Sequence, residues 1–271
     1  MKYAFMSFSC PQLPLDEMLS LAKRLGYDGI EPRMDSGHKH GVEVDADVAA
    51  RREIKRKAAD SGIAICCVAT SCRCADADAS NVQEKTDYTR RCIDLAADVG
   101  APRLRVFGGQ IPEGVGREKA IEGVSESLGA VADHADERSV VVCMETHDDW
   151  CIPEHVAEVM KRVDHPAIGV NWDIMHPVRR GGATMDGAFD TLHSWIRHLH
   201  VHDGSRQTGK LVPIGRGFID HRRAIELLLT LPYDGYLSGE WINWEDPYEV
   251  HLPRELATLK RYEQEARQDG G

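Results

Sequence analysis

The stretch VVVCMETHDDW (140–150) begins as an apolar run and ends in ionisable side chains, and three later stretches repeat this pattern. They are IGVNWDIMH (168–176), IRHLHVHDG (196–204) and YLSGEW (236–241). Short apolar runs rich in Val, Ile, Leu, Cys or Tyr are typical of parallel strands that are covered on both faces. We therefore expect four buried strands that each deliver polar chemistry at the carboxyl end.

Apolar runs of this kind occur eight times along the chain, and each is followed by a segment with helical spacing. The predicted strands are Lys2 to Phe8, Gly29 to Pro32, Ile63 to Ala69, Arg103 to Phe107, Val140 to Glu145, Ile168 to Asp173, His198 to His202 and Tyr236 to Glu240. The predicted helices are Leu15 to Leu25, Asp47 to Ser61, Asn81 to Val99, Arg117 to Ala135, Pro153 to Val163, Gly187 to Ser194, His221 to Thr230 and Pro253 to Ala266. This alternation predicts βαβ units and a parallel sheet.

Eight alternations within 271 residues fit a single closed (β/α)8 TIM barrel better than an open doubly wound sheet. An open sheet of that kind usually has a glycine-rich nucleotide-binding turn after its first strand, and none follows here. Gly215-Arg-Gly217 is too short for that fingerprint and precedes the seventh predicted helix. Because no linker or low-complexity tract divides the chain, residues 1–271 are predicted to form one α/β domain.

Composition argues against two classes of partner. The chain has 44 acidic and 33 basic residues and a formal net charge of -11, which disfavours binding to the phosphate backbone of nucleic acid. The first residues, MKYAFMSFSCPQLPLDE (1–17), contain too short an apolar run for a signal peptide. No stretch approaches the ~20 apolar residues that cross a bilayer. We therefore expect a cytoplasmic protein without a nucleic-acid or membrane partner.

Four of the eight cysteines lie close together in the sequence, at Cys66, Cys67, Cys72 and Cys74, which raises the possibility of a zinc site. The adjacent pair should point to opposite faces of a strand, and no C-x-x-C pair occurs. Buried, reduced thiols are the better interpretation, and they agree with a reducing cytosol.

The four strand ends quoted above carry the candidate metal ligands, which are Glu145, Asp173, His200 and Glu240. In a closed barrel the carboxyl ends of the strands converge on one mouth. An unpaired carboxylate buried there would cost several kcal/mol or stay protonated, and a shared divalent cation resolves that conflict. Singly, each residue is more often a strand cap or a salt-bridge partner. Together, three carboxylates and an imidazole favour one Mn²⁺ ion, with Mg²⁺, Co²⁺ or Zn²⁺ as alternatives.

In this order and spacing the motifs resemble the xylose isomerase-like barrel superfamily. It includes sugar phosphate isomerases and epimerases, ketose 3-epimerases, inosose isomerases and dehydratases, and endonuclease IV. The resemblance covers nearly the whole chain. It is carried by Glu145-Thr-His-Asp148, Asp173-Ile-Met-His176, His198-Leu-His200-Val-His202-Asp203, Gly239-Glu240 and the loop Leu211-Val-Pro-Ile-Gly-Arg-Gly-Phe-Ile-Asp220.

The resemblance implies that the same four residues bind the metal, and that Glu145 and Glu240 also exchange protons with the substrate. It further implies that His176 and Arg206 contact substrate oxygens. Members of the superfamily are commonly dimers or tetramers, so a homodimer or homotetramer is expected.

The sequence departs from the family at His202, where many members carry lysine. A titratable imidazole therefore replaces a permanently charged side chain. His202 is expected to contact the substrate. That makes a phosphorylated substrate less well supported. Arg179-Arg180-Gly-Gly182 could supply a phosphate or carboxylate site instead, and it could equally be a solvated or subunit-contact loop.

The function predicted from these residues is metal-dependent isomerisation or epimerisation of a sugar, ketose or inosose through an enediolate. Glu145 and Glu240 would act as the acid/base pair. The nearest alternative is a dehydratase (lyase) of a keto-inositol or related polyol, because the same enediolate can expel a β-hydroxyl. More remote are a non-catalytic polyol-binding barrel and an endonuclease IV-like nuclease. The nuclease would need histidines where Ala69-Thr-Ser71 and Phe107-Gly-Gly109 stand.

Three further residues are candidate substrate contacts. His147 lies two residues beyond Glu145 and is expected to orient a ligand or to donate to the substrate. His38, in the loop SGHKHG (36–41), is expected near the mouth, although loop histidines are more often surface residues. Trp241 is expected to present an aromatic wall to the C–H face of a sugar.

Glu31 and Arg105 lie on the second and fourth predicted strands. We expect them to form a buried ion pair below the site, in a structural role.

Overall fold

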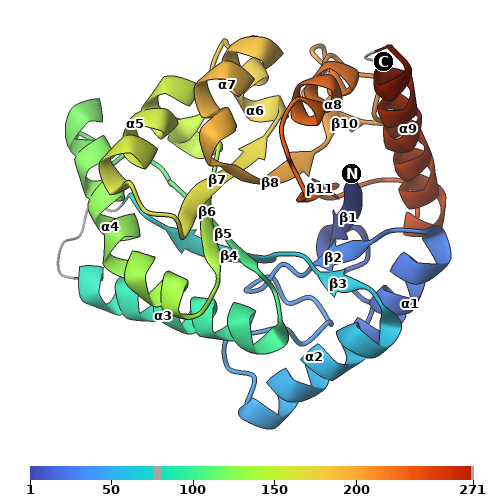
Figure 1. The fold of residues 1–271 in the computed structure, drawn as a ribbon, viewed down its shortest axis with the longest axis horizontal. Helices are drawn as coiled ribbons and strands as arrows, with labels where there is room; N and C mark the ends of the chain where they lie inside the picture. The colour runs from blue at the N-terminus through green and yellow to red at the C-terminus, as the bar shows by residue number, and fades with distance from the viewer. Residues whose placement is uncertain (76–80, 270–271) are drawn as a thin grey trace.

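The strands form one parallel sheet that curves into a barrel surrounded by helices (Figure 1). This computed structural model describes residues 1–75 and 81–269. The strands of the sheet are β1 (Lys2–Met6), β2 (Gly29–Glu31), β3 (Ala64–Ile65), β4 (Val68–Arg73), β5 (Arg103–Phe107), β6 (Val141–Glu145), β7 (Ile168–Asp173), β8 (Ile196–Val201) and β11 (Tyr236–Gly239). Their order in the sheet is β3-β2-β1-β11-β8-β7-β6-β5-β4.

The barrel closes through the predicted third strand, which is broken into β3 and β4. β3 pairs with β2, and β4 pairs with β5. An isolated parallel bridge between Arg33 and Ala69 joins the end of β2 to β4, supported by hydrogen bonds from Ala69 N to the Pro32 oxygen (2.9 Å) and from Met34 N to the Ala69 oxygen (3.0 Å). The eight predicted strands therefore form a closed (β/α)8 barrel, which confirms the predicted fold class.

The helices cover the outside of the barrel. They are α1 (Leu15–Leu25), α2 (Val48–Ser61), α3 (Val82–Val99), α4 (Arg117–Glu137), α5 (Pro153–Val163), α6 (Met175–Arg179), α7 (Met185–Leu192), α8 (His221–Leu229) and α9 (Tyr248–Asp269). α9 lies between α8 and α1 and completes the ring of helices (Figure 1). None of the described helices is both long and apolar enough to span a membrane.

Helix ends follow the local sequence signals closely. Gly26, Gly62 and Gly100 end α1, α2 and α3 with φ values of 82°, 74° and 84°. This left-handed conformation suits glycine because it lacks a Cβ atom. The bounds of α1 and α5, like those of β5 and β7, match the predicted ones.

Other elements differ from prediction. The sequence patterns missed α6 and the short hairpin of β9 (Asp203–Gly204) and β10 (Leu211–Val212). Helix α9 begins at Tyr248 and includes Pro253, which was predicted to start it. Helix α7 begins before the predicted Gly187, because the Thr184 hydroxyl accepts a hydrogen bond from Gly187 N at 3.0 Å and caps the helix.

Alternation along each strand separates an apolar outer layer from a polar interior. On β7, Val170 and Trp172 belong to the hydrophobic core, whereas Asn171 and Asp173 occupy the alternate positions. Polar side chains that are fully buried at such inner positions are Glu31, Arg105, Asn171, His198 and Ser238. Barrel interiors are usually filled with branched apolar residues. Polar side chains in the layer beneath the mouth therefore indicate that this layer supports a functional site.

We predict that Gly108→Ala destabilises the fold. A Cβ atom at Gly108 would collide with the buried Trp150 ring and the Met144 methyl group. Overpacking of this kind costs about 1–3 kcal/mol, measurable by chemical denaturation. The matched control is Gly129→Ala on α4, where nothing lies within 4 Å of the new Cβ and helix propensity favours alanine. Equal stability of the two variants would contradict the packing argument.

Candidate metal centre

The four predicted metal ligands lie together at the carboxyl ends of neighbouring strands. Glu145 ends β6, Asp173 ends β7, His200 lies in β8, and Glu240 directly follows β11. Parallel pairing sets Asp173 beside His200. All four are buried, and one ligand atom of each lies within 4.8 Å of all the others. The closed barrel therefore gathers residues that are far apart in the sequence.

His200 is held between carboxylates. Its Nδ1 lies 2.7 Å from Glu145 Oε1 and 3.5 Å from Glu240 Oε2, and its Nε2 lies 3.0 Å from Glu31 Oε1. Glu31 also pairs with His198 Nε2 at 2.8 Å. A ring that donates from Nε2 to a carboxylate has its tautomer fixed, which leaves the Nδ1 lone pair for a cation.

Neighbouring histidines lower the pKa of three carboxyl groups here, those of Glu31, Asp173 and Glu240. Burial alone would raise the pKa of Glu31, but His200 and His198 hold it well below its usual value. In Glu240, His200 outweighs burial and lowers the pKa to about 2. The pKa of Asp173 is also lowered, by His202 and His176 acting against burial.

Two carboxylate oxygens of the cluster are buried without a hydrogen bond. Glu145 Oε2 faces only the Arg105 Nε atom, at 3.4 Å. Asp173 Oδ2 is 2.7 Å from His202 Nε2, but without hydrogen-bond geometry. Carboxyl oxygens with free lone pairs, beside an imidazole nitrogen, form a donor set that suits a hard divalent cation. The residues present therefore fit the metal that the sequence pattern predicts.

Three histidines continue from the cluster toward the rim. The rings of His147 and His176 are 4.5 Å apart, and those of His176 and His202 are 5.6 Å apart. Asp173 begins α6 by accepting hydrogen bonds from the backbone N–H groups of Met175 and His176, and this short helix sets the His176 ring beside the cluster.

His202 replaces the lysine found in many family members, yet it carries similar charge. Burial lowers its pKa, but Asp173 outweighs that effect and raises the pKa to about 9. The Asp173 carboxylate therefore favours the protonated form of His202, which has the same charge as a lysine.

The other predicted substrate contacts are placed differently. The Arg206 side chain is exposed, and its guanidinium lies 4.4 Å from the centre of the Phe218 ring. Trp241 is fully buried, with its ring packed against Gly239 and 5.4 Å from that of His251, so it offers no exposed face to a sugar in this conformation. His38 is half-buried, and its Nδ1 lies 2.8 Å from Ser7 Oγ.

The predicted Glu31–Arg105 ion pair is wrong. Both side chains are fully buried, but Glu31 pairs with two histidines of β8, whereas Arg105 on β5 faces Glu145 on the adjacent strand β6. Arg105 also donates to the Thr70 carbonyl oxygen at 2.8 Å. Strand periodicity cannot predict this choice of partner, because inward-facing side chains reach across the barrel as well as along it.

Sequence reasoning also passed over Arg33, at the bridge that closes the barrel. The available signal was the stretch GIEPR (29–33), in which ionisable residues follow a predicted strand just as they do at the four ligand strands.

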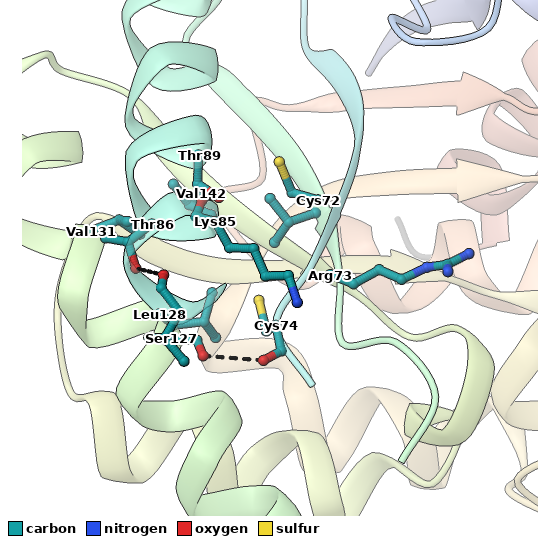
Figure 2. A pocket seen from close by; sticks show the side chains of 12 residues that line it. Cys72, Arg73, Cys74, Lys85, Thr86, Thr89, Ser127, Leu128, Val131 and Val142 are labelled. Carbon is teal, nitrogen blue, oxygen red and sulfur yellow. Dashed lines mark hydrogen bonds between the residues drawn. The ribbon is translucent and has the colours of Figure 1, made fainter. Parts of the chain in front are cut away.

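The clustered cysteines form no metal site among the described residues. Cys66 and Cys67 are fully buried, and burial raises the pKa of both thiols. Figure 2 shows Cys72 and Cys74 beside a pocket of about 40 Å³ between β4, α3 and α4. There the Ser127 hydroxyl donates to the Cys74 carbonyl oxygen at 3.1 Å. Cys66, Cys67 and Cys72 are therefore buried thiols, as predicted, whereas Cys74 is only partly buried.

The sequence model of the xylose isomerase-like TIM barrel family matches residues 19–262. The chain belongs to this family, which confirms the resemblance seen in its motifs.

Individual relatives are distant. L-ribulose-5-phosphate 3-epimerase UlaE of Salmonella typhimurium is 24% identical over 235 residues, covering 83% of this chain and 81% of that protein. The uncharacterized protein MJ1311 of Methanocaldococcus jannaschii is 24% identical over 165 residues, covering 58% of this chain and 56% of that protein. The solved structure of the probable 3-DHS dehydratase AsbF of Bacillus anthracis superposes with a TM-score of 0.79 at 19% identity, over 96% of this chain and 99% of that one. This structural likeness shows a shared fold.

We predict that Glu31→Gln weakens metal binding without unfolding the protein. The amide cannot hold the His200 ring as an ionised carboxylate does, and loss of such an outer partner reduces metal affinity about 10–100-fold. Titration of the metal-free protein with Mn²⁺ measures the effect. Glu17→Gln, at an exposed position of α1, is the control. Unchanged Mn²⁺ affinity in Glu31→Gln would show that Glu31 does not support the site.

Proposed function

We propose that this protein is a divalent-metal-dependent sugar isomerase or epimerase that acts on a ketose or an inosose. The observation that carries the proposal is the buried cluster of Glu145, Asp173, His200 and Glu240, whose ligand atoms lie within 4.8 Å of one another. Support also comes from the relative named as an L-ribulose-5-phosphate 3-epimerase. Mn²⁺ is the proposed metal, because the set is rich in oxygen and includes one nitrogen.

A divalent cation held by these four side chains would supply a Lewis acid that polarises a substrate carbonyl. The protein's own part is to hold the ligands in place. Glu31 fixes the His200 ring, and Arg105 Nε lies 3.4 Å from Glu145 Oε2. These contacts set the carboxylates before substrate arrives, so little reorganisation is needed during the reaction.

Glu145 and Glu240 are the proposed acid/base pair. They come from β6 and β11, with β7 and β8 between them in the sheet, so they approach the centre of the mouth from different sides. As a carboxylate, Glu240 would accept a proton from the carbon next to the carbonyl. Glu145, in its protonated form, would donate its proton to the opposite face of that carbon and so invert it. Glu240 would then hold the abstracted proton, and proton exchange with solvent would reset the pair.

A dehydratase is the second candidate, and His147 favours it. Expulsion of a hydroxyl group needs an additional acid, and His147 lies at the mouth with a side chain 30% exposed and Nδ1 2.9 Å from Asp148 Oδ1. Burial lowers the pKa of His147, but Asp148 and Glu145 outweigh it and raise the pKa above its usual value. The relative described as a probable 3-DHS dehydratase is consistent with this alternative.

We also propose a reducing compartment such as the cytosol. All eight cysteines are free thiols, and all except Cys74 are buried.

Removal of the metal should abolish activity. After chelation, ketoses and inososes incubated in D₂O should exchange no carbon-bound hydrogen, and addition of Mn²⁺ should restore exchange, followed by NMR. Solvent deuterium in recovered sugar without loss of water identifies an isomerase or epimerase, whereas water loss identifies the dehydratase. Exchange that survives complete chelation contradicts the proposed metal dependence.

Glu145→Gln should lower turnover at least about 100-fold while preserving the fold, because the amide can neither donate nor accept the proton that Glu145 is proposed to exchange with the substrate. Turnover of the Mn²⁺-loaded variant and its circular dichroism test this together. Glu154→Gln, an exposed residue on α5, is the matched control and should retain full activity. Normal turnover in Glu145→Gln would remove this residue from the mechanism.

A further inference from the structure

The side of the barrel mouth formed by β1, β2, β4 and β5 contributes no proposed metal ligand, but it holds a buried cation. Arg33 lies two residues beyond the end of β2 and is only 9% exposed. By strand alternation it follows Glu31 on the inner side of the barrel. Two of the proposed ligands, Glu240 and Glu145, are near enough to Arg33 to act on its charge.

Arg33 is held in place by neutral partners. One terminal nitrogen donates to the Met34 carbonyl oxygen, and the other donates to Ser71 Oγ at 2.7 Å. Nε makes no hydrogen bond to any residue in the described ranges 1–75 and 81–269, and no carboxylate there lies within 4.0 Å of the guanidinium. Most of its donors therefore remain free for a ligand.

Nearby acids do not neutralise this charge directly. Asp35 Oδ1 accepts from the Tyr88 hydroxyl at 2.8 Å, and its Oδ2 accepts weakly from Ser71 N at 3.4 Å. No nitrogen of Arg33 is a fully buried atom without a hydrogen-bond partner, so its remaining donors are open to solvent or to a ligand. Arg105, the other buried arginine, shows the contrast because it faces Glu145 at 3.4 Å.

The charge on Arg33 persists despite its burial. Burial and the neighbouring Arg105 lower its pKa to about 10, and Asp35, Glu240 and Glu145 oppose that change. At neutral pH the guanidinium is thus a cation with free donors at the mouth, and an anion is the group that would complete its coordination.

Adjacent side chains fix this position. Ser7 Oγ accepts from Arg33 N at 2.8 Å and lies 2.8 Å from His38 Nδ1, while His40 Nε2 lies 3.2 Å from the Arg33 carbonyl oxygen. Burial and Arg33 lower the pKa of His38, so this half-buried ring is a neutral hydrogen-bonding group. The subsite is therefore built before any ligand arrives.

We propose that Arg33, with Ser71 and His38, binds an anionic oxygen group of the substrate, and that the substrate is a negatively charged sugar. This inference rests on the proposed function, because it assumes a sugar whose carbonyl lies at the four ligands. The shared chemistry is an oxyanion, either a phosphate ester or a carboxylate. The Arg179–Arg180 loop considered from the sequence is a poorer site, since Arg179 and Arg180 are exposed and Arg179 donates to the Gly209 carbonyl oxygen.

The test measures binding by calorimetry with three unreactive ligands of five carbons: ribitol, ribitol 5-phosphate and ribonate. The Mn²⁺-loaded wild type should bind one of the two anions more tightly than ribitol, and the preferred anion identifies phosphate ester or carboxylate. Arg33→Met should weaken that anion about 30-fold or more and leave ribitol unchanged. Arg33→Lys, which keeps the positive charge, should recover part of the anion affinity that Arg33→Met loses.

Arg73→Met is the matched control, because it removes the same charge from a neighbouring strand. Arg73 is exposed, and Figure 2 shows it projecting away from the pocket beside Cys72 and Cys74. The anion affinity of Arg73→Met should equal that of the wild type.

The proposal is overturned if the wild type binds the anions and ribitol equally well. It is also overturned if Arg33→Met weakens the binding of anions and ribitol by the same factor. If Arg33→Met does not fold, Ser71→Ala replaces it, and an unchanged anion preference there counts against the subsite.

Failure of this inference is distinguishable from failure of the proposed function. One result would be that the wild type shows no preference for anions and that Arg33→Met exchanges protons on neutral ketoses at the wild-type rate. That result overturns the anion subsite but leaves the proposed isomerase function standing. The opposite result would be that Arg33 binds an anion but the protein exchanges protons on no ketose or inosose. That result supports the anion subsite and overturns the proposed isomerase function.

Discussion

The hydrogen-bonded contact between His200 and Glu31 is the interaction on which the centre depends. The Nε2–Oε1 distance of 3.0 Å fixes the ring, and Nδ1 then points at Glu145 and Glu240. Both partners are fully buried, so neither can exchange the other for water. A buried ionised carboxylate needs such partners, and the histidines of β8 provide them for Glu31. The orientation of the metal-facing nitrogen follows from this pair.

This constraint explains the unusual interior of the barrel. A layer of polar side chains replaces the branched apolar residues that usually fill it, and that layer supports the ligands above it. The hydrophobic core lies instead between the sheet and the helices, where Val170 and Trp172 pack. Each of these strands therefore packs apolar side chains against the helices on its outer face and presents polar side chains to the barrel interior on its inner face. The outer packing stabilises the fold, so the mouth can contain buried charges.

Much of the fold could be predicted because its signals are local. Apolar runs mark the strands, and glycines such as Gly26 and Gly100 end helices where a left-handed residue is required. Short elements were missed because non-local contacts create them. The carboxylate of Asp173 starts α6, and strand pairing across a loop forms β9 and β10. The partners of Arg105 and Glu31 were also assigned wrongly for that reason, since both side chains point into a shared interior.

By itself, the sequence determined the alternation of strands and helices and the four ionisable residues at the ends of successive strands, because periodicity and strand direction are properties of the chain. Only the tertiary structure decided which charges meet. Barrel closure brings Arg33 to the mouth, where no carboxylate of residues 1–75 or 81–269 contacts it, and sets Glu31 against His198 and His200. The physical reason is that the interaction energy of charges depends on their separation and burial, and closure of the sheet fixes both.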